Sequence, residues 1–116
     1  MSDVEIIKRV TNELCKNDHD AAVLEQYFAP EFTFWSNGQQ GDLSEFSARM
    51  VEYGKNYKNM TIPNWDELFA TDHRVVVSYI FEAHKHDGAT NRSAVMAIWQ
   101  LRDGKIVALR QVLAGV

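Results

Sequence analysis

The stretch "RSAVMAIWQLRDGKIVALRQVL", Arg92 to Leu113, consists of two alternating runs separated by Asp103-Gly104. Neighbouring side chains of a strand point to opposite faces, and an Asp-Gly pair between two such runs favours a tight turn. The stretch therefore predicts a β-hairpin. One face of its first strand is largely apolar and would carry Ser93, Val95, Ala97, Trp99 and Leu101.

Two further runs precede this hairpin: residues 60–71, "MTIPNWDELFAT", and residues 74–84, "RVVVSYIFEAH". Short polar segments separate them, so the pattern from residue 60 onward predicts a four-stranded antiparallel meander. Pro63 cannot donate to a ladder, which places the first run at a sheet edge or at a bend. Alternation puts five side chains of the second run on an inward face: Val75, Val77, Tyr79, Phe81 and Ala83.

The first half of the chain reads as helices around one strand. Ser2 and Glu5 form a capping-box pattern before an apolar stripe, which predicts a first helix. A second helix is expected over about residues 21–28, capped by Asp18 or Asp20 and ended by Pro30. Residues 31–36, "EFTFWS", predict a strand that ends at the Asn37-Gly38 turn, and a third helix follows from residue 43.

The predicted order is thus two helices, a strand, a helix and a meander. This is an α+β layout in which helices cover one face of a curved sheet. A length of 116 residues, 46% of them apolar, is consistent with one domain over residues 1–116.

Composition argues against several classes of partner. The formal charge is −4 and no basic run occurs, so neither nucleic acid nor an anionic membrane is expected as a partner. The acidic start lacks the features of a signal peptide, and no run is long enough to span a bilayer, so we expect a cytoplasmic protein. Cys15 is the only cysteine, which excludes a disulfide within the chain.

The outward face of the meander is also apolar, at Ile80, Met96 and Ile98. Helices on one side cannot cover it, so a second copy of the chain is the simplest cover. We therefore predict a homodimer through this outer sheet face.

The segments "YFAPEFTF", residues 27–34, and "RDGKIV", residues 102–107, resemble the nuclear transport factor 2-like superfamily, in particular its SnoaL-like and ketosteroid-isomerase-like members. The similarity extends over essentially the whole chain in order and spacing. It implies a strongly curved antiparallel sheet that N-terminal helices close into a cone, with a cavity between them and a dimer packed through the outer sheet face.

The resemblance also implies positions for the isomerase chemistry, and this sequence departs from it there. The carboxylate base of ketosteroid isomerases falls on Ser36, their oxyanion-binding tyrosine on Val10 and their protonated aspartic acid on Ala97. None of these residues carries the group that the mechanism needs, so ketosteroid isomerisation by that route is not expected.

The candidate ligand-binding residues combine aromatic walls with polar tips: Phe34, Ser36, Tyr79, Phe81, Trp99 and Gln111. Ordinary core packing is the alternative for the aromatic residues, and a purely structural turn is the alternative for Ser36 and Asn37. Gln111 either contacts a ligand or reaches backbone at the sheet edge. Trp65 and Tyr53 could close the mouth of the cavity or belong to the core.

We expect no cofactor and no metal. His84 and His86 lie two residues apart beside Asp87, but this segment is the tip of a predicted hairpin and lacks a third ligand. Glu82 and His84 should face outward, away from any cavity. Cys15 has no partner arrangement that would activate it as a nucleophile.

The sequence therefore favours a protein that binds a small hydrophobic molecule in an apolar cone-shaped cavity. The alternative is a cofactor-independent acid–base enzyme, of isomerase, dehydratase or polyketide-cyclase type. It needs a titratable group in the cavity, and Asp66 and Glu67 are the residues of which one could point inward. A plain association module without a cavity is a third alternative.

Overall fold

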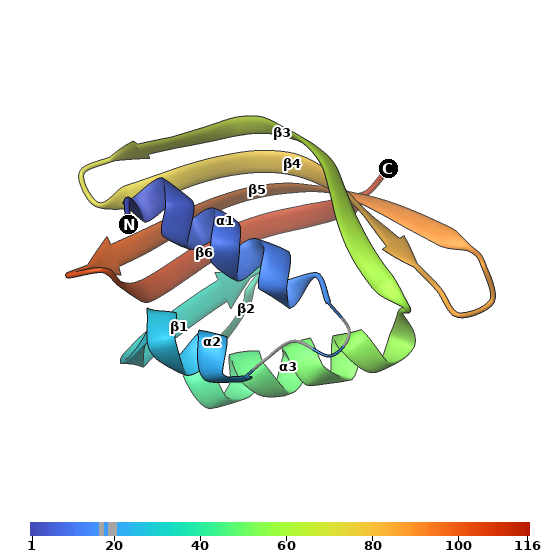
Figure 1. Ribbon diagram of the computed structural model, residues 1–116, viewed down its shortest axis with the longest axis horizontal. Helices are drawn as coiled ribbons and strands as arrows, with labels where there is room; N and C mark the ends of the chain where they lie inside the picture. The colour runs from blue at the N-terminus through green and yellow to red at the C-terminus, as the bar shows by residue number, and fades with distance from the viewer. Residues whose placement is uncertain (17, 19–20) are drawn as a thin grey trace.

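The computed structural model describes residues 1–16, 18 and 21–116 (Figure 1). The predicted cap of the second helix depends partly on Asp20, which lies outside the described residues. The helices and strands follow in the order α1 (Asp3–Leu14), α2 (Ala21–Tyr27), β1 (Phe28–Ser36), β2 (Gln39–Asp42), α3 (Leu43–Asn56), β3 (Asn59–Thr71), β4 (Arg74–His84), β5 (Thr90–Arg102) and β6 (Lys105–Gly115).

The six strands form one curved sheet in the order β2-β1-β6-β5-β4-β3. Strands β3 to β6 form the predicted antiparallel meander, and the α+β fold with a curved sheet and N-terminal helices is confirmed. One pair departs from the antiparallel expectation, because β1 pairs with β6 in parallel. The long path through α3 and the meander allows this, since parallel neighbours need a crossover rather than a tight turn.

Strand β2 was not predicted. Its polar sequence, "QQGD", lacks the alternation that identifies a half-buried strand. It forms because the preceding turn folds the chain directly back on β1, pairing Ser36 with Gln39 and Thr33 with Asp42. Asn37 and Gly38 have φ angles of 48° and 87°, as a two-residue hairpin turn requires. The predicted Asn37-Gly38 turn is confirmed.

The ends of the helices show which capping patterns could be predicted from the sequence. Ser2 Oγ accepts a hydrogen bond from the Glu5 backbone N–H at 3.2 Å, so α1 begins where predicted. Helix α3 begins with a capping box between Asp42 and Glu45 that the sequence analysis missed. The chain leaves α2 at Tyr27 and enters β1 at Phe28, so Pro30 lies inside a strand instead of directly after the helix.

The helices pack on one face of the sheet and define its inner side. Helix α1 contacts β3 and β4, whereas α3 contacts β1 and β2 (Figure 1). The inward faces predicted for β4 and β5 are confirmed, because the apolar side chains on them are buried. Edge strand β3 has two register shifts, one of them between Thr61 and Asn64 beside Pro63, and such bulges bend a strand. Among the described residues, none of the helices is long and apolar enough to cross a bilayer.

Candidate functional site

A cavity of about 140 Å³ lies between the inner face of the sheet and helices α1 and α3. Apolar side chains from both helices and from the four meander strands make up most of its wall: Leu14, Phe46, Met50, Met60, Phe81, Val95, Leu109 and Leu113. Such a wall favours apolar ligands, because binding removes apolar surface from water.

Six lining residues can form hydrogen bonds: Thr11, Cys15, Tyr53, Tyr79, Trp99 and Gln111. Burial raises the pKa of the Cys15 thiol to about 11. Burial, and to a smaller extent the neighbouring Tyr57, raises the pKa of Tyr53 to about 12. Burial also raises the pKa of Tyr79, with a smaller contribution from Cys15. These three groups are therefore neutral near pH 7, and the described part of the cavity wall offers hydrogen bonds without charge.

Four of the six sequence-predicted residues lie together in this wall: Tyr79, Phe81, Trp99 and Gln111. They come from the neighbouring strands β4, β5 and β6, and their inward register brings them onto one face. Ser36 lies next to the wall on β1, where its Oγ accepts a hydrogen bond of 3.2 Å from Gln111 Nε2. Ser36 therefore orients the Gln111 amide.

Phe34 occupies a different place from the one expected. Its ring packs against Phe46, with 5.7 Å between the centroids, and the Arg49 guanidinium lies 4.9 Å from the Phe34 centroid. On β2 the ring packs over Gly41, where a Cβ atom would lie only 2.7 Å from Phe34 Cε1. Phe34 therefore joins β1 to β2 and α3 and is not among the cavity-lining residues.

Asn37 has a structural role at the turn. Its side-chain Nδ2 donates to the Leu113 carbonyl at 2.9 Å, and its Oδ1 accepts from the Leu113 N–H at 3.0 Å. The side chain thus copies the pairing of a strand residue with β6. This geometry favours the turn interpretation of Asn37 over ligand contact.

Tyr53 of α3 was considered at the mouth of the cavity, but the other helical contributions to the wall were not predicted: Thr11, Leu14 and Cys15 from the end of α1, and Phe46 and Met50 from α3. The available signal was helical spacing, because Leu14, Met50 and Tyr53 belong to the apolar stripes of their helices. Tyr53 lines the cavity, whereas Trp65 of β3 packs against Tyr79 with tilted rings and 4.9 Å between the centroids.

Neither Asp66 nor Glu67 lines the cavity. Both are exposed on β3: Asp66 accepts a hydrogen bond from Asn64, and Glu67 lies on the outer sheet face beside Met96 and Ile98. Within residues 1–16, 18 and 21–116, the cavity wall contains no Asp, Glu or His side chain. The described part of the wall thus offers no general base with a pKa near neutrality.

Comparison with known proteins agrees with this architecture. The sequence profile of the SnoaL-like domain matches residues 10–109, most of the chain. The chain belongs to the SnoaL-like family. Among curated proteins, none matches this sequence significantly.

Solved structures show the same fold as this SnoaL-like domain. IdmH from Streptomyces antibioticus, provisionally identified as a polyketide cyclase, superimposes with a TM-score of 0.84 at 14% identity, over 97% of this chain and 92% of its own. An NTF2-like protein from Anabaena variabilis superimposes with a TM-score of 0.82 at 16% identity, over 97% of this chain and 91% of its own. AclR from Streptomyces galilaeus, provisionally identified as a hydroxylase, superimposes with a TM-score of 0.77 at 15% identity, over 97% of this chain and 77% of its own. At these identities the likeness establishes the fold alone.

Two of the three isomerase positions contain core residues in this SnoaL-like domain. Val10 and Ala97 are buried in the hydrophobic core, and neither lines the cavity. Ser36 holds Gln111 as described. The structure therefore gives no support for a ketosteroid-isomerase constellation at these three positions.

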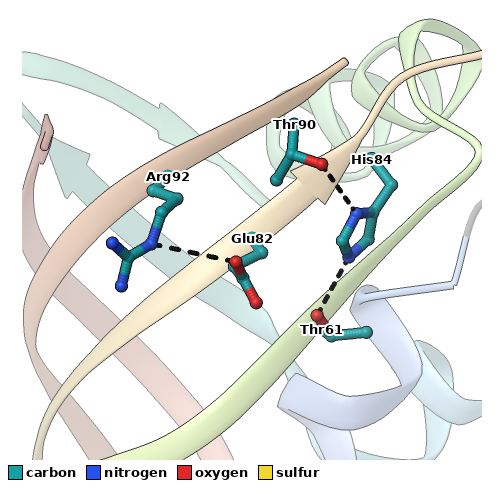
Figure 2. A network of polar contacts seen from close by, with 5 residues as sticks. All are labelled: Thr61, Glu82, His84, Thr90 and Arg92. Atoms are coloured by element: carbon teal, nitrogen blue, oxygen red, sulfur yellow. Dashed lines mark hydrogen bonds and ion pairs between the residues drawn. The ribbon is translucent and has the colours of Figure 1, made fainter. Parts of the chain in front are cut away.

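Figure 2 shows a network of polar contacts across β3, β4 and β5. It includes His84, one of the two histidines considered above as metal ligands. His84 Nε2 lies 3.1 Å from Thr61 Oγ1, and His84 Nδ1 lies 3.2 Å from Thr90 Oγ1. Arg92 Nε lies 3.8 Å from a carboxylate oxygen of Glu82. His86 instead contacts the Lys55 carbonyl at the end of α3. The two imidazoles therefore do not converge, and the described residues contain no group of three His, Cys, Asp or Glu side chains able to hold a metal.

Proposed function

We propose that this SnoaL-like protein binds one compact, largely apolar molecule in the cavity between α1, α3 and the sheet. The observation that carries the proposal is the cavity itself, about 140 Å³ with a mainly apolar wall. An engineered apolar cavity of roughly 150 Å³ in another protein holds benzene, so this volume suits a ligand with a single ring. A larger ligand requires movement of the flexible lining side chains, such as Met50 and Met60.

The alternative is acid–base catalysis without a cofactor, and the provisional polyketide cyclase IdmH among the similar structures is what favours it. The chemistry of the described wall supports binding instead. Its titratable groups, Cys15, Tyr53 and Tyr79, have raised pKa values and remain protonated at neutral pH. A proton-abstracting base works best with a pKa near the working pH.

The test is ligand titration followed by NMR or calorimetry, with benzene, toluene and cyclohexanone. We expect dissociation constants on the order of 0.1–1 mM, as suits such small ligands. We also expect little change between pH 5.5 and 8.5, because no described lining group should titrate there. Leu113→Phe should weaken binding at least about fivefold by filling part of the cavity.

Leu68→Phe is the matched control, because Leu68 is also partly buried against the core but does not line the cavity. It should bind the same ligands as the unaltered protein. Binding that survives Leu113→Phe unchanged, or saturable binding by none of the three ligands, would contradict the proposed function. A strong pH dependence near neutrality would favour the acid–base alternative.

We also propose that the protein is a homodimer through the outer sheet face. Met96, Ile98 and Val112 are 64%, 43% and 47% exposed, and they adjoin a surface groove on β4, β5 and β6. Large apolar side chains gathered in this way are typical of an association surface.

A further inference from the structure

Trp99, which lines the candidate site, carries a polar atom in an unusual state. The residue lies on the inward face of β5, is 4% exposed and lines the cavity. Its indole Nε1 is buried and is the one such side-chain nitrogen or oxygen in the described part of the chain without a hydrogen-bond partner. Buried tryptophan N–H groups normally have a partner, because leaving a donor unpaired is costly.

The protein around Trp99 explains why the donor has none. The strand opposite places Leu109 beside Trp99, and the Phe28 ring meets the indole edge to face with 6.4 Å between centroids. Gln111 lies on the same face, diagonal to Trp99; its Nε2 donates to Ser36 Oγ, and its amide oxygen does not accept a hydrogen bond from the indole. The neighbours of the indole are thus mainly apolar, and the nearby polar side chain is held by β1.

We propose that the Trp99 N–H recognises an uncharged carbonyl oxygen on the ligand, such as that of a cyclic ketone or a lactone. This inference rests on the proposed function, since it names the chemistry of the ligand in the same cavity. A carbonyl pairs the orphaned donor, whereas a hydrocarbon of the same shape leaves it unpaired. A carboxylate is disfavoured, because no cation lines the described cavity wall to offset its desolvation.

The test uses cyclohexanone and methylenecyclohexane, which differ only in C=O against C=CH₂. The two ligands are titrated into the unaltered protein and into Trp99→Phe, which removes the N–H and keeps a ring. The ratio of the two dissociation constants should shift about tenfold against the ketone in Trp99→Phe. Comparing the two proteins cancels the different hydration of the two ligands. Trp35→Phe, on the outer sheet face, is the control and should leave the ratio unchanged.

A second measurement uses the unaltered protein and does not depend on the folding of Trp99→Phe. The chain has three tryptophans, so an ¹H–¹⁵N spectrum should contain three indole signals, which the single variants Trp35→Phe and Trp65→Phe assign by elimination. Cyclohexanone should move the Trp99 indole proton downfield, as a new hydrogen bond to oxygen does. Methylenecyclohexane should leave that proton close to its position in the free protein.

The outcomes separate the two proposals. Binding of both ligands with an unchanged ratio in Trp99→Phe, or without a downfield shift of the Trp99 signal, overturns the carbonyl inference and leaves the cavity function intact. An upfield indole signal that neither ligand moves also overturns it, because the N–H would then point at the Phe28 ring. Binding of neither ligand overturns the carbonyl inference, and it overturns the cavity function as well only if benzene and toluene also fail to bind.

Discussion

At the scale of single residues, Cys15 makes the unfolding free energy depend on pH. Burial raises the pKa of its thiol from 9.0 to about 11. Between these two values the unfolded chain loses the thiol proton while the folded chain keeps it. Ionisation therefore favours the unfolded state, so the stabilising contribution is complete below pH 9 and is lost as the pH rises toward 11.

We predict that Cys15→Ala removes this pH dependence. The unfolding free energy of the unaltered protein, relative to Cys15→Ala, should fall by about 2 kcal/mol between pH 8 and pH 10.5. Urea denaturation in the presence of a reductant measures this fall, and the titration of groups that Cys15 does not influence cancels in the difference. Cys15→Ser, whose hydroxyl does not titrate, should behave like Cys15→Ala. A difference that stays constant over this range would show that the folded thiol ionises normally.

At the scale of elements, the contact between β1 and β2 depends on a residue without a side chain. A Cβ atom on Gly41 would lie 2.7 Å from Phe34 Cε1 and 2.9 Å from Glu45 Oε2. The Phe34 ring cannot easily retreat, because it is buried beside Phe46 and under the Arg49 guanidinium. The close approach of the two strands thus requires glycine at this position.

Gly41→Ala should destabilise the protein by about 1–3 kcal/mol, the usual cost of forcing an extra methyl group into a packed contact. Gly115→Ala is the control, since its added Cβ would meet only Arg92 O at 3.9 Å, and it should stay within about 0.5 kcal/mol. Chemical denaturation compares the two variants. Phe34→Leu in the Gly41→Ala background should recover part of the loss, because the shorter side chain relieves the contact. Equal stabilities of the two alanine variants would refute this account of β1 and β2.

Elements were predictable where alternation was strong. The inward faces of β4 and β5 could be predicted residue by residue, because the buried side chains recur at every second position over most of Val75 to Ala83 and Val95 to Leu101. Strand β2 could not be predicted in this way, because its pairing comes from the turn before it and its side chains are mostly exposed. The parallel pairing of β1 with β6 depends on where the chain returns after the meander, which local pattern does not determine.

The candidate site was predictable in part for the same reason. A strand register assigns each side chain to a face, and this predicted that Tyr79, Phe81, Trp99 and Gln111 lie on the face that lines the cavity. The same reasoning predicted that Phe34 lines the cavity, but its ring packs over Gly41 and against Phe46 of α3 instead. Most of the helical wall, including Cys15 and Met50, depends on how α1 and α3 dock on the sheet, and helical spacing alone does not specify that docking.

At the scale of the whole molecule, the two faces of β5 suggest two separate tasks. Val95, Ala97 and Trp99 point to the core and the cavity, while the alternate residues Met96 and Ile98 are exposed. On β6, Val112 pairs with Met96, which widens the apolar outer surface across two strands. A second copy of the chain would cover this surface, and symmetric packing would bring the same patch from each subunit together.

We predict a mass near twice 13.3 kDa by light scattering at micromolar concentration. Met96→Glu should shift the protein to monomer, because symmetry places two new charges in one apolar contact and each would lose its hydration. Val51→Glu is the matched control: Val51 is 51% exposed on α3, away from the outer sheet face, so the variant should remain dimeric. A monomeric unaltered protein would remove the dimer proposal. Loss of the dimer in Val51→Glu but not in Met96→Glu would place the contact on the helical side instead.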